Sequence, residues 1–238
     1  MRESERVRVS IITGVSRGLG AELMAQLSAR GDRVVGIGRD PTRLTVPERV
    51  QLHEADLARP ETLPAPDQFA DWLAGASCAA LVHNAATVEP IGAVGALPPD
   101  QVATAVTVNL TAPMLLTNAF LAALPADLPA TILFISSRAA KSPIEGWSVY
   151  GATKRAGEVF FDALAGQLAG RRRVSVAIAQ PGVMDTGMQA TIRRAAAAGA
   201  WFPDADRFLA MHERGELPSP AEVAAGIIAE HLLEVTVQ

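Results

Sequence analysis

Residues 7–20, with the sequence VRVSIITGVSRGLG, predict the fold of the chain. The first half of this stretch is short, apolar and rich in β-branched residues, which is typical of a buried parallel strand. A glycine-rich turn from Gly14 to Gly20 follows, and the residues up to Arg30 have the apolar period of a helix. The start of such a helix offers free N–H groups to a pyrophosphate, and glycines let the ligand approach the backbone. The alternative is a tight turn that binds nothing.

Short apolar strands and helices alternate along the rest of the chain. We expect strands at residues 32–37, 49–54, 78–83, 130–135 and 174–179, and helices within 60–76 and at 99–124, 147–170, 188–198, 204–214 and 218–233. The helix at 99–124 should be interrupted near Asn109 and Pro113, because a proline inside a helix frees carbonyl groups. This alternation predicts a single α/β domain over residues 1–238, a doubly wound (Rossmann-type) parallel sheet with helices on both faces. The tail 234–238 is expected to form a short seventh strand or none.

Composition excludes several classes of function. The net charge of −4 and the pI near 5.6 leave no basic surface for nucleic acid. A charged start and the lack of a long uninterrupted apolar run predict neither a signal peptide nor a membrane span. Cys78 is the one cysteine, so neither a disulfide framework nor a cysteine metal site is expected. These features predict a cytoplasmic protein that binds no metal, nucleic acid or membrane.

Arginines near the end of the second expected strand favour NADP(H) over NAD(H). In dinucleotide-binding folds an acidic residue at this position contacts the ribose 2′-hydroxyl, whereas an arginine accommodates a 2′-phosphate. Here the strand is followed by Gly38 and Arg39, and Arg17 is available from the glycine turn. Two planar guanidinium groups suit the oxygens of a phosphate dianion. Asp40 opposes this interpretation, but in an extended segment its side chain should point away from that of Arg39.

Tyr150 is the single tyrosine in 238 residues, and Lys154, four residues later, is one of only two lysines. In a helix this spacing places the phenol and the ammonium group on one face, one turn apart. A nearby cation favours the phenolate and so lowers the pKa of the phenol, which makes the group useful for proton transfer. The alternative is a core tyrosine and a solvated lysine. We interpret the pair as catalytic.

Two further polar residues have weaker interpretations. His83, at the end of an expected strand, is more typical of a structural histidine than of a catalytic base, because the sequence gives it no partner. Asn109, one turn before the expected helix interruption, could hold an ordered water there or simply be a polar residue on a bent helix.

Large apolar side chains in the second half of the chain could form a wide substrate pocket with an adaptable lid. They are Trp147, Met184, Met188, Trp201, Phe202 and Phe208. Residues 187–217, where an alanine-rich segment is broken by a proline, are the expected lid. The alternative, that most of these side chains belong to the core, is equally consistent with the sequence.

Taken in chain order, the motifs resemble those of the short-chain dehydrogenase/reductase family. They are Thr13-Gly14-x-x-x-Gly18-x-Gly20, Asp56, Asn84-Ala85-Ala86, Asn109, Ser137, Tyr150-x-x-x-Lys154 and Pro181-Gly182-x-x-x-Thr186. Each motif is weak alone, but the ordered set is specific and covers nearly the whole chain. The runs 146–150 and 181–189 are similar to those of the benzil reductase branch, close to the sepiapterin reductases. The chain departs from the family at Ala86, where glycine is usual, and in stopping soon after its last helix.

The resemblance implies a role for individual residues. Asn109, Ser137, Tyr150 and Lys154 would be catalytic. Ser137, Trp147, Tyr150 and Met184 would contact the substrate. The contacts with NADP(H) would come from Gly14, Ser16, Arg17, Gly18, Leu19, Gly20, Arg39, Asp56, Leu57, Asn84, Ala85, Ala86, Tyr150, Lys154, Pro181, Gly182, Val183, Thr186 and Met188.

The resemblance also implies an activity, the transfer of a hydride from NADPH to a ketone with Tyr150 as the general acid. The expected substrate is an aromatic ketone or a benzil-like 1,2-diketone. The alternatives are a sepiapterin-type or 3-oxoacyl-type ketone reductase, and a regulatory protein that senses NADP(H) without turnover. The expected assembly is a homo-oligomer, either a dimer or a tetramer.

Overall fold

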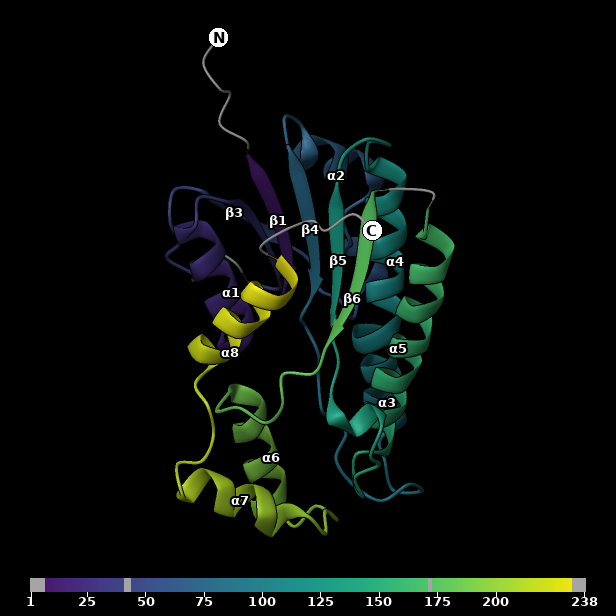
Figure 1. Cartoon of the computed structure of the whole chain (residues 1–238). Coiled ribbons are helices and arrows are strands. Elements are labelled where there is room, and N and C mark those ends of the chain that lie inside the picture. The colour runs from purple at the N-terminus through teal and green to yellow at the C-terminus, as the bar shows by residue number, and fades with distance from the viewer. Residues whose placement is uncertain (1–6, 41–43, 171–172, 233–238) are drawn as a thin grey trace.

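A six-stranded parallel sheet with the strand order β3-β2-β1-β4-β5-β6 forms the centre of the molecule (Figure 1). The computed structural model describes residues 7–40, 44–170 and 173–232. The strands are β1 (Arg8–Thr13), β2 (Arg33–Gly38), β3 (Val50–Glu54), β4 (Cys78–His83), β5 (Ala130–Ile135) and β6 (Val174–Ala179). The prediction of one doubly wound sheet is confirmed. The tail 234–238, the place of the expected seventh strand, lies outside the described residues.

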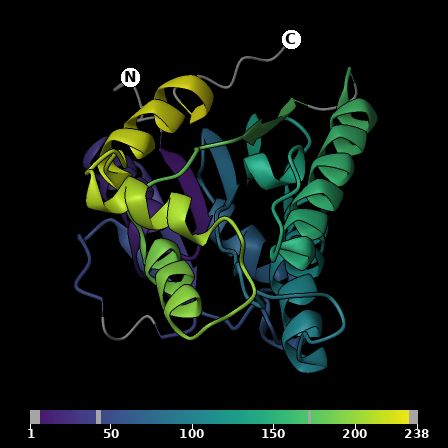
Figure 2. The same ribbon diagram turned by 90° about the horizontal axis from the view of Figure 1, so that it is seen from below.

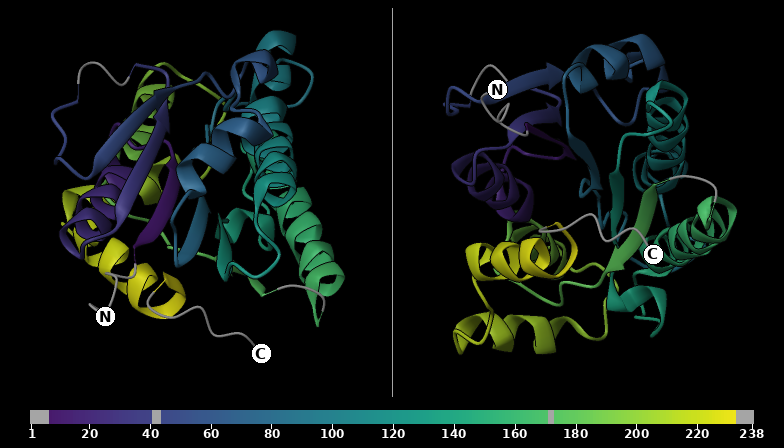
Figure 3. Two further views of the ribbon diagram at one scale, coloured as in Figure 1. Left: turned by 90° about the horizontal axis from the view of Figure 1, so that it is seen from above. Right: turned by 45° about the horizontal axis from the view of Figure 1, so that its top comes forward.

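Helices cover both faces of this sheet (Figures 1 and 3). They are α1 (Gly18–Ala29), α2 (Pro66–Leu73), α3 (Pro99–Val106), α4 (Ala112–Ala123), α5 (Ser148–Leu168), α6 (Gly187–Ala197), α7 (Ala205–Glu213) and α8 (Pro220–Ile227). Helices α1 and α8 pack on one face, whereas α2, α4 and α5 pack on the other. Helices α6 and α7 lie beyond the ends of the strands, below the sheet in Figure 1.

The alternation of side chains along each strand divides the core into two layers. In β1, Val9 and Ile11 point toward α2, α4 and α5, whereas Ile12 points toward α1 and α8. Phe69 and Trp72 of α2 are buried in the first layer, with their rings edge to face and 5.2 Å apart between centroids. Burial on both faces explains why the strands are apolar along nearly their whole length.

The helical run Pro99–Ala123 is interrupted where the sequence predicts it. Residues Thr107–Thr111 form a π-helical turn between α3 and α4. Pro113 has no N–H to donate to the carbonyl of Asn109, four residues earlier, so the α-helical pattern cannot continue through this point. Among the described residues, this run is also the one helix long and apolar enough to cross a bilayer. In this structure, Leu116 and Phe120 of α4 are buried in the core layer between the sheet and the helices α2, α4 and α5.

The last helical segment is held at both ends. At its start, the Ser219 hydroxyl accepts a hydrogen bond from the Glu222 N–H (3.2 Å), and the Glu222 carboxylate accepts one from the Ser219 N–H (3.0 Å). This reciprocal pair is a capping box. At its end, Nη1 of Arg30 donates to the carbonyl of Leu232 (2.8 Å).

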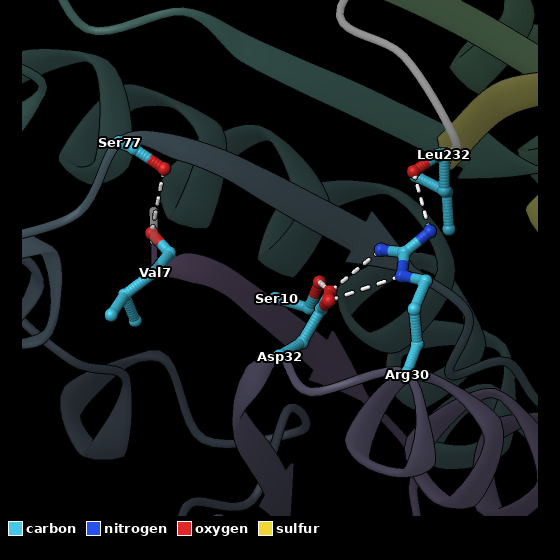
Figure 4. A network of polar contacts seen from close by, with 6 residues as sticks. All are labelled: Val7, Ser10, Arg30, Asp32, Ser77 and Leu232. Atoms are coloured by element: carbon cyan, nitrogen blue, oxygen red, sulfur yellow. Dashed lines mark hydrogen bonds and ion pairs between the residues drawn. The ribbon is translucent and has the colours of Figure 1, made fainter. Parts of the chain in front are cut away.

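Arg30 also takes part in an ion pair near the amino ends of the inner strands β1 and β2, at the other end of the sheet from the carboxyl ends of the strands (Figure 4). Its Nη2 and Nε donate to the two carboxylate oxygens of Asp32, at 2.7 and 3.1 Å. The Ser10 hydroxyl donates to the same carboxylate (2.7 Å), and Asp32 is only 2% exposed. One buried carboxylate therefore joins β1, the turn after α1 and, through Arg30, the end of the last helix.

We expect Asp32→Ala to lower the free energy of unfolding by about 2–3 kcal/mol, because it leaves Arg30 and Ser10 without their buried acceptor. Urea unfolding followed by circular dichroism measures the change. The control is Glu216→Ala, which removes the bidentate partner of Arg214 at a site where both side chains are half exposed. Exposed pairs contribute little, so a loss for Glu216→Ala as large as that for Asp32→Ala would contradict this account.

Candidate active site

A cavity of about 520 Å³ lies at the carboxyl ends of the strands, where open parallel sheets bind ligands. Figure 2 views the molecule from this end. The wall includes nearly all residues that the resemblance assigns to NADP(H): Gly14, Ser16, Arg17, Gly18, Leu19, Arg39, Asp56, Leu57, Asn84, Ala85, Ala86, Tyr150, Lys154, Pro181, Gly182, Val183, Thr186 and Met188. It also includes Ser137, Trp147 and Met184 from the expected substrate contacts. Gly20 and Asn109 are the two predicted site residues that are not part of the wall.

The glycine turn is fitted closely to its neighbours. Gly14 has a φ of +76°, and a Cβ there would lie 2.9 Å from the Cα of Ala85. A Cβ on Gly20 would strike the carbonyl oxygen of Gly14 and the side-chain amide of Asn84. Gly20 therefore lies behind the cavity wall, where it lets the start of α1 pack against the turn. The chain offers main-chain groups at a helix start to the cavity, which fits a dinucleotide pyrophosphate.

Hydrogen bonds from the end of β4 hold this turn in place. The Thr13 hydroxyl accepts from the main-chain N–H groups of Asn84 and Ala85, both at 3.1 Å. The side-chain amide of Asn84 donates to the carbonyls of Thr13 (3.0 Å) and Gly14 (3.2 Å). The ends of β1 and β4 are thereby joined beyond their main-chain ladder.

The two arginines expected at the 2′-phosphate both lie on the cavity wall. Arg39 is exposed just after β2. The guanidinium group of Arg17 lies against Gly187, since a Cβ there would be 3.1 Å from Nε of Arg17. Within the part of the chain that the structure describes, and apart from its two chain neighbours, no atom lies within 4 Å of where a Cβ on Gly38 would be.

Helix α5 carries Tyr150 and Lys154 on the face turned to the sheet. Tyr150 is 5% exposed, and the side chain of Ser137 lies close enough to its hydroxyl to act on its pKa. Nζ of Lys154 donates to the carbonyl of Ile135 (2.7 Å) and lies 5.9 Å from the centre of the Tyr150 ring. The spacing of four residues thus brings both groups to one end of β5, as the sequence predicts.

The titration of this pair differs from the expectation. Burial raises the pKa of Tyr150, although the nearby Ser137 side chain acts in the opposite direction. Burial lowers the pKa of Lys154 to about 7. The pKa of the phenol is therefore raised in this structure and not lowered as predicted, because burial outweighs the effect of a lysine that is only partly charged at neutral pH.

Asn109 is fully buried, and its side chain is occupied by protein partners. Its Oδ1 accepts from the N–H of Thr87 (2.8 Å), and its Nδ2 donates to the carbonyl of Thr87 (2.8 Å) and the hydroxyl of Thr153 (3.1 Å). The Thr153 hydroxyl in turn donates to the carbonyl of Tyr150 (2.9 Å). A water at this position would have to bind the main chain of the π-helical turn rather than the amide.

His83 has a structural role. It is 1% exposed, and its Nε2 lies 2.8 Å from the Thr117 hydroxyl. Burial, and to a smaller degree the charge of Lys154, lower its pKa to about 3, so the imidazole is neutral. The interpretation of His83 as a structural histidine agrees with this position.

The large apolar residues separate into wall and support. Trp147, Met184, Met188 and Phe208 line the cavity. Phe202 is buried behind them, where its ring stacks on Trp147 at 5.3 Å between centroids. Trp201 is 51% exposed and is not on the wall. Trp201 and Phe202 therefore do not line the pocket: Phe202 belongs to the core, which is the alternative that the sequence left open, and Trp201 is exposed.

Sequence reasoning missed Glu158. It lies one turn after Lys154 on α5, is 3% exposed, and accepts hydrogen bonds from Ser136 (2.8 Å) and Gln180 (2.7 Å). The signal in the sequence is the continued spacing of four residues from Tyr150 through Lys154 to Glu158, on a helix whose other carboxylate, Asp162, is exposed.

Comparisons with known proteins agree with this geometry. A family model described as short chain dehydrogenase matches residues 8–197. The benzil reductase ((S)-benzoin forming) of Bacillus cereus is 33% identical over 241 residues, which cover 96% of this chain and 94% of that protein. The sepiapterin reductase of Bos taurus is 30% identical over 216 residues, covering 77% and 75% of the two chains. The crystal structure of the KRED1-Pglu enzyme matches with a TM-score of 0.83 at 30% identity, covering 96% of this chain and 97% of that one.

The lowered pKa of Lys154 predicts a pH dependence of stability. Between pH 7 and its ordinary value of 10.5, the unfolded chain binds a proton that the folded chain does not, so stability falls as the pH falls through this window. We expect wild type to gain about 1–2 kcal/mol relative to Lys154→Met between pH 7.5 and 9.0, measured by urea unfolding. The exposed lysine serves as control: Lys141→Met should keep the wild-type slope. Equal slopes for wild type and Lys154→Met would contradict the burial of a neutral lysine.

Proposed function

The chain belongs to the short-chain dehydrogenase/reductase family, and we propose that it is an NADPH-dependent reductase of aromatic ketones or benzil-like 1,2-diketones. Membership of this family and the benzil reductase relatives make the protein an oxidoreductase that acts on carbonyl compounds with a nicotinamide cofactor. The observation that carries the proposal is Tyr150 on the cavity wall, together with Ser137 and one turn from the buried Lys154.

The cavity wall supplies the groups that would hold the cofactor. The turn from Gly14 to Gly18 would bind the pyrophosphate, and Arg17 and Arg39 would bind the 2′-phosphate that distinguishes NADPH from NADH. Val183 and Thr186 would hold the carboxamide. When bound, the reduced nicotinamide supplies the hydride that the carbonyl carbon accepts.

The protein's own residues would manage the proton. Tyr150, whose raised pKa keeps it protonated, donates to the carbonyl oxygen as that oxygen gains charge, and the product is a secondary alcohol. Ser137 orients the same oxygen by hydrogen bonding. Lys154 binds the ribose and, when charged, stabilises the phenolate left behind. A water at the π-helical turn of Asn109 returns the proton to Tyr150.

Three features support the choice of substrate and the assembly. Trp147, Met184 and Phe208 give the cavity an apolar end suited to an aromatic ketone, and residues 187–217, which include α6 and α7, would act as a lid over it. The whole chain would form a single NADP-binding domain.

Exposed apolar side chains on α3, α4 and α5, namely Val106, Leu115 and Val159, suit a surface buried between copies in a cytoplasmic homo-oligomer. The sepiapterin reductase relative makes reduction of a pterin side chain the second candidate.

A substrate panel tests the function. We expect benzil and related aromatic diketones to be reduced faster than pterins, 3-oxoacyl thioesters and steroids, and NADPH to have a KM about tenfold or more below that of NADH, because the 2′-phosphate adds a charged contact worth about 1.4 kcal/mol or more. The measurement is oxidation of the cofactor, followed at its near-ultraviolet absorbance. Tight binding of NADPH with no turnover of any carbonyl would favour a sensor, and faster turnover of sepiapterin would favour the second candidate.

The role of Tyr150 has a separate test. Tyr150→Phe should lower kcat by about 10²–10⁴-fold, the usual contribution of a general acid, while NADPH still binds. Cofactor fluorescence measures the binding and benzil reduction measures kcat. Phe161→Tyr, which places a phenol elsewhere on α5, should not rescue a Tyr150→Phe background. Full activity of Tyr150→Phe would refute the assignment.

A further inference from the structure

Successive turns of α5 hold successive residues at the end of β5. Nζ of Lys154 donates to the carbonyl of Ile135 (2.7 Å), and one turn later Oε1 of Glu158 accepts from the hydroxyl of Ser136 (2.8 Å). The next residue after Ser136 is Ser137, whose side chain acts on the hydroxyl of Tyr150, one turn before Lys154. Tyr150, Lys154 and Glu158 of α5 thus lie beside the end of β5 and the two serines that follow it.

Glu158 also holds the end of the neighbouring strand. The same Oε1 accepts from Nε2 of Gln180 (2.7 Å), the residue that precedes Pro181 and Gly182. The main-chain bond from Ser136 N–H to the carbonyl of Ala179 (2.8 Å) joins β5 and β6 at this point. The carboxylate therefore adds a second link between the two chain segments, just beyond the last main-chain hydrogen bond between β5 and β6 and next to the cavity.

The carboxylate is built into the protein rather than exposed at its surface. Glu158 is 3% exposed, and its remaining contact, with Arg155 at 3.4 Å, is made by an arginine that is 59% exposed. Burial alone would raise the pKa of Glu158, but the hydrogen bonds from Ser136 and Gln180 bring it below its ordinary value, so the group is ionised at neutral pH. Hydrogen bonds to an ionised acceptor are short and strong, which suits a group that fixes two strand ends.

We propose that Glu158 is a positioning residue that clamps the ends of β5 and β6, so that Ser137 and the segment 181–186 keep their places relative to Tyr150. The inference rests on the proposed function, because those two segments are the ones that would meet the carbonyl oxygen and the nicotinamide. Glu158 itself lies behind the cavity wall and acts through Ser136 and Gln180.

The test compares Glu158→Ala with Glu158→Gln. The alanine variant removes both hydrogen bonds. The glutamine variant keeps an oxygen that can accept from both partners, but it removes the charge and the acceptor that faces the exposed Arg155. The control is Asp162→Ala, an exposed carboxylate one turn further along α5. Ser136→Ala and Gln180→Ala each release one strand end and serve if the Glu158→Ala variant does not fold.

Two measurements are made on the full chain. Hydrogen–deuterium exchange follows the amides of residues 135–140 and 180–186, and benzil reduction gives kcat and KM. For Glu158→Ala we expect faster exchange in both segments and a kcat lowered by about 10–100-fold, the effect of a shift of up to about 1 Å in a catalytic group. Glu158→Gln and Asp162→Ala should stay within about threefold of wild type, since one keeps both acceptor contacts and the other is solvated. Ser136→Ala should loosen the first segment and Gln180→Ala the second.

Each outcome is decisive. Unchanged exchange in Glu158→Ala overturns the clamp, as does a Glu158→Gln variant as impaired as the alanine variant, which would make the charge rather than the hydrogen bonds responsible. Faster exchange together with an unchanged kcat would reduce Glu158 to a structural residue and also overturn the proposal. If wild type reduces no ketone, the proposed function fails, while the exchange measurement still decides whether Glu158 holds the two strand ends.

Discussion

The contact between the ammonium group of Lys154 and the carbonyl of Ile135 fixes the geometry of the site. A fully buried lysine is costly unless it is hydrogen-bonded, and this bond places it at one defined point, the end of β5. Because Tyr150 and Glu158 lie one turn to either side on the same helix, their positions follow from it. The positions of the proposed proton donor, Tyr150, and of the proposed clamp, Glu158, thus follow from one buried contact.

That contact requires α5 to lie close to the sheet, and the absence of a side chain at Gly157 makes this approach possible. A Cβ on Gly157 would strike the ring of Phe134, so any larger residue would push the helix outward. Phe134 also lies beneath Nζ of Lys154, 4.8 Å from its ring centre, and stacks on Phe161. Lys154 and Glu158 of α5 therefore reach the carboxyl end of β5 because Gly157 and Phe134 pack together without a gap beside them.

The sequence predicts the parts of this molecule that depend on local pattern. Strand positions, the glycine turn, the break near Pro113 and the shared face of Tyr150 and Lys154 all follow from periodicity and residue type. Features that depend on tertiary surroundings were not predictable in this way. The role of Glu158 depends on Ser136 and Gln180, each 22 residues away in the chain, and a charge at helical spacing usually indicates a solvated face. The raised pKa of Tyr150 depends on burial, which no spacing reveals.

The crowding of the glycine turn has a consequence for how cofactor choice can change over evolution or by engineering. Gly14 packs against Ala85, and Gly20 packs against Gly14 and Asn84, so neither position has room for an added methyl group. Among the described residues none crowds Gly38, and the exposed Arg39 follows it. The proposed discrimination between the two nicotinamide dinucleotides could therefore change through substitutions at the end of β2, whereas the crowded turn proposed to bind their common part leaves no room for substitution.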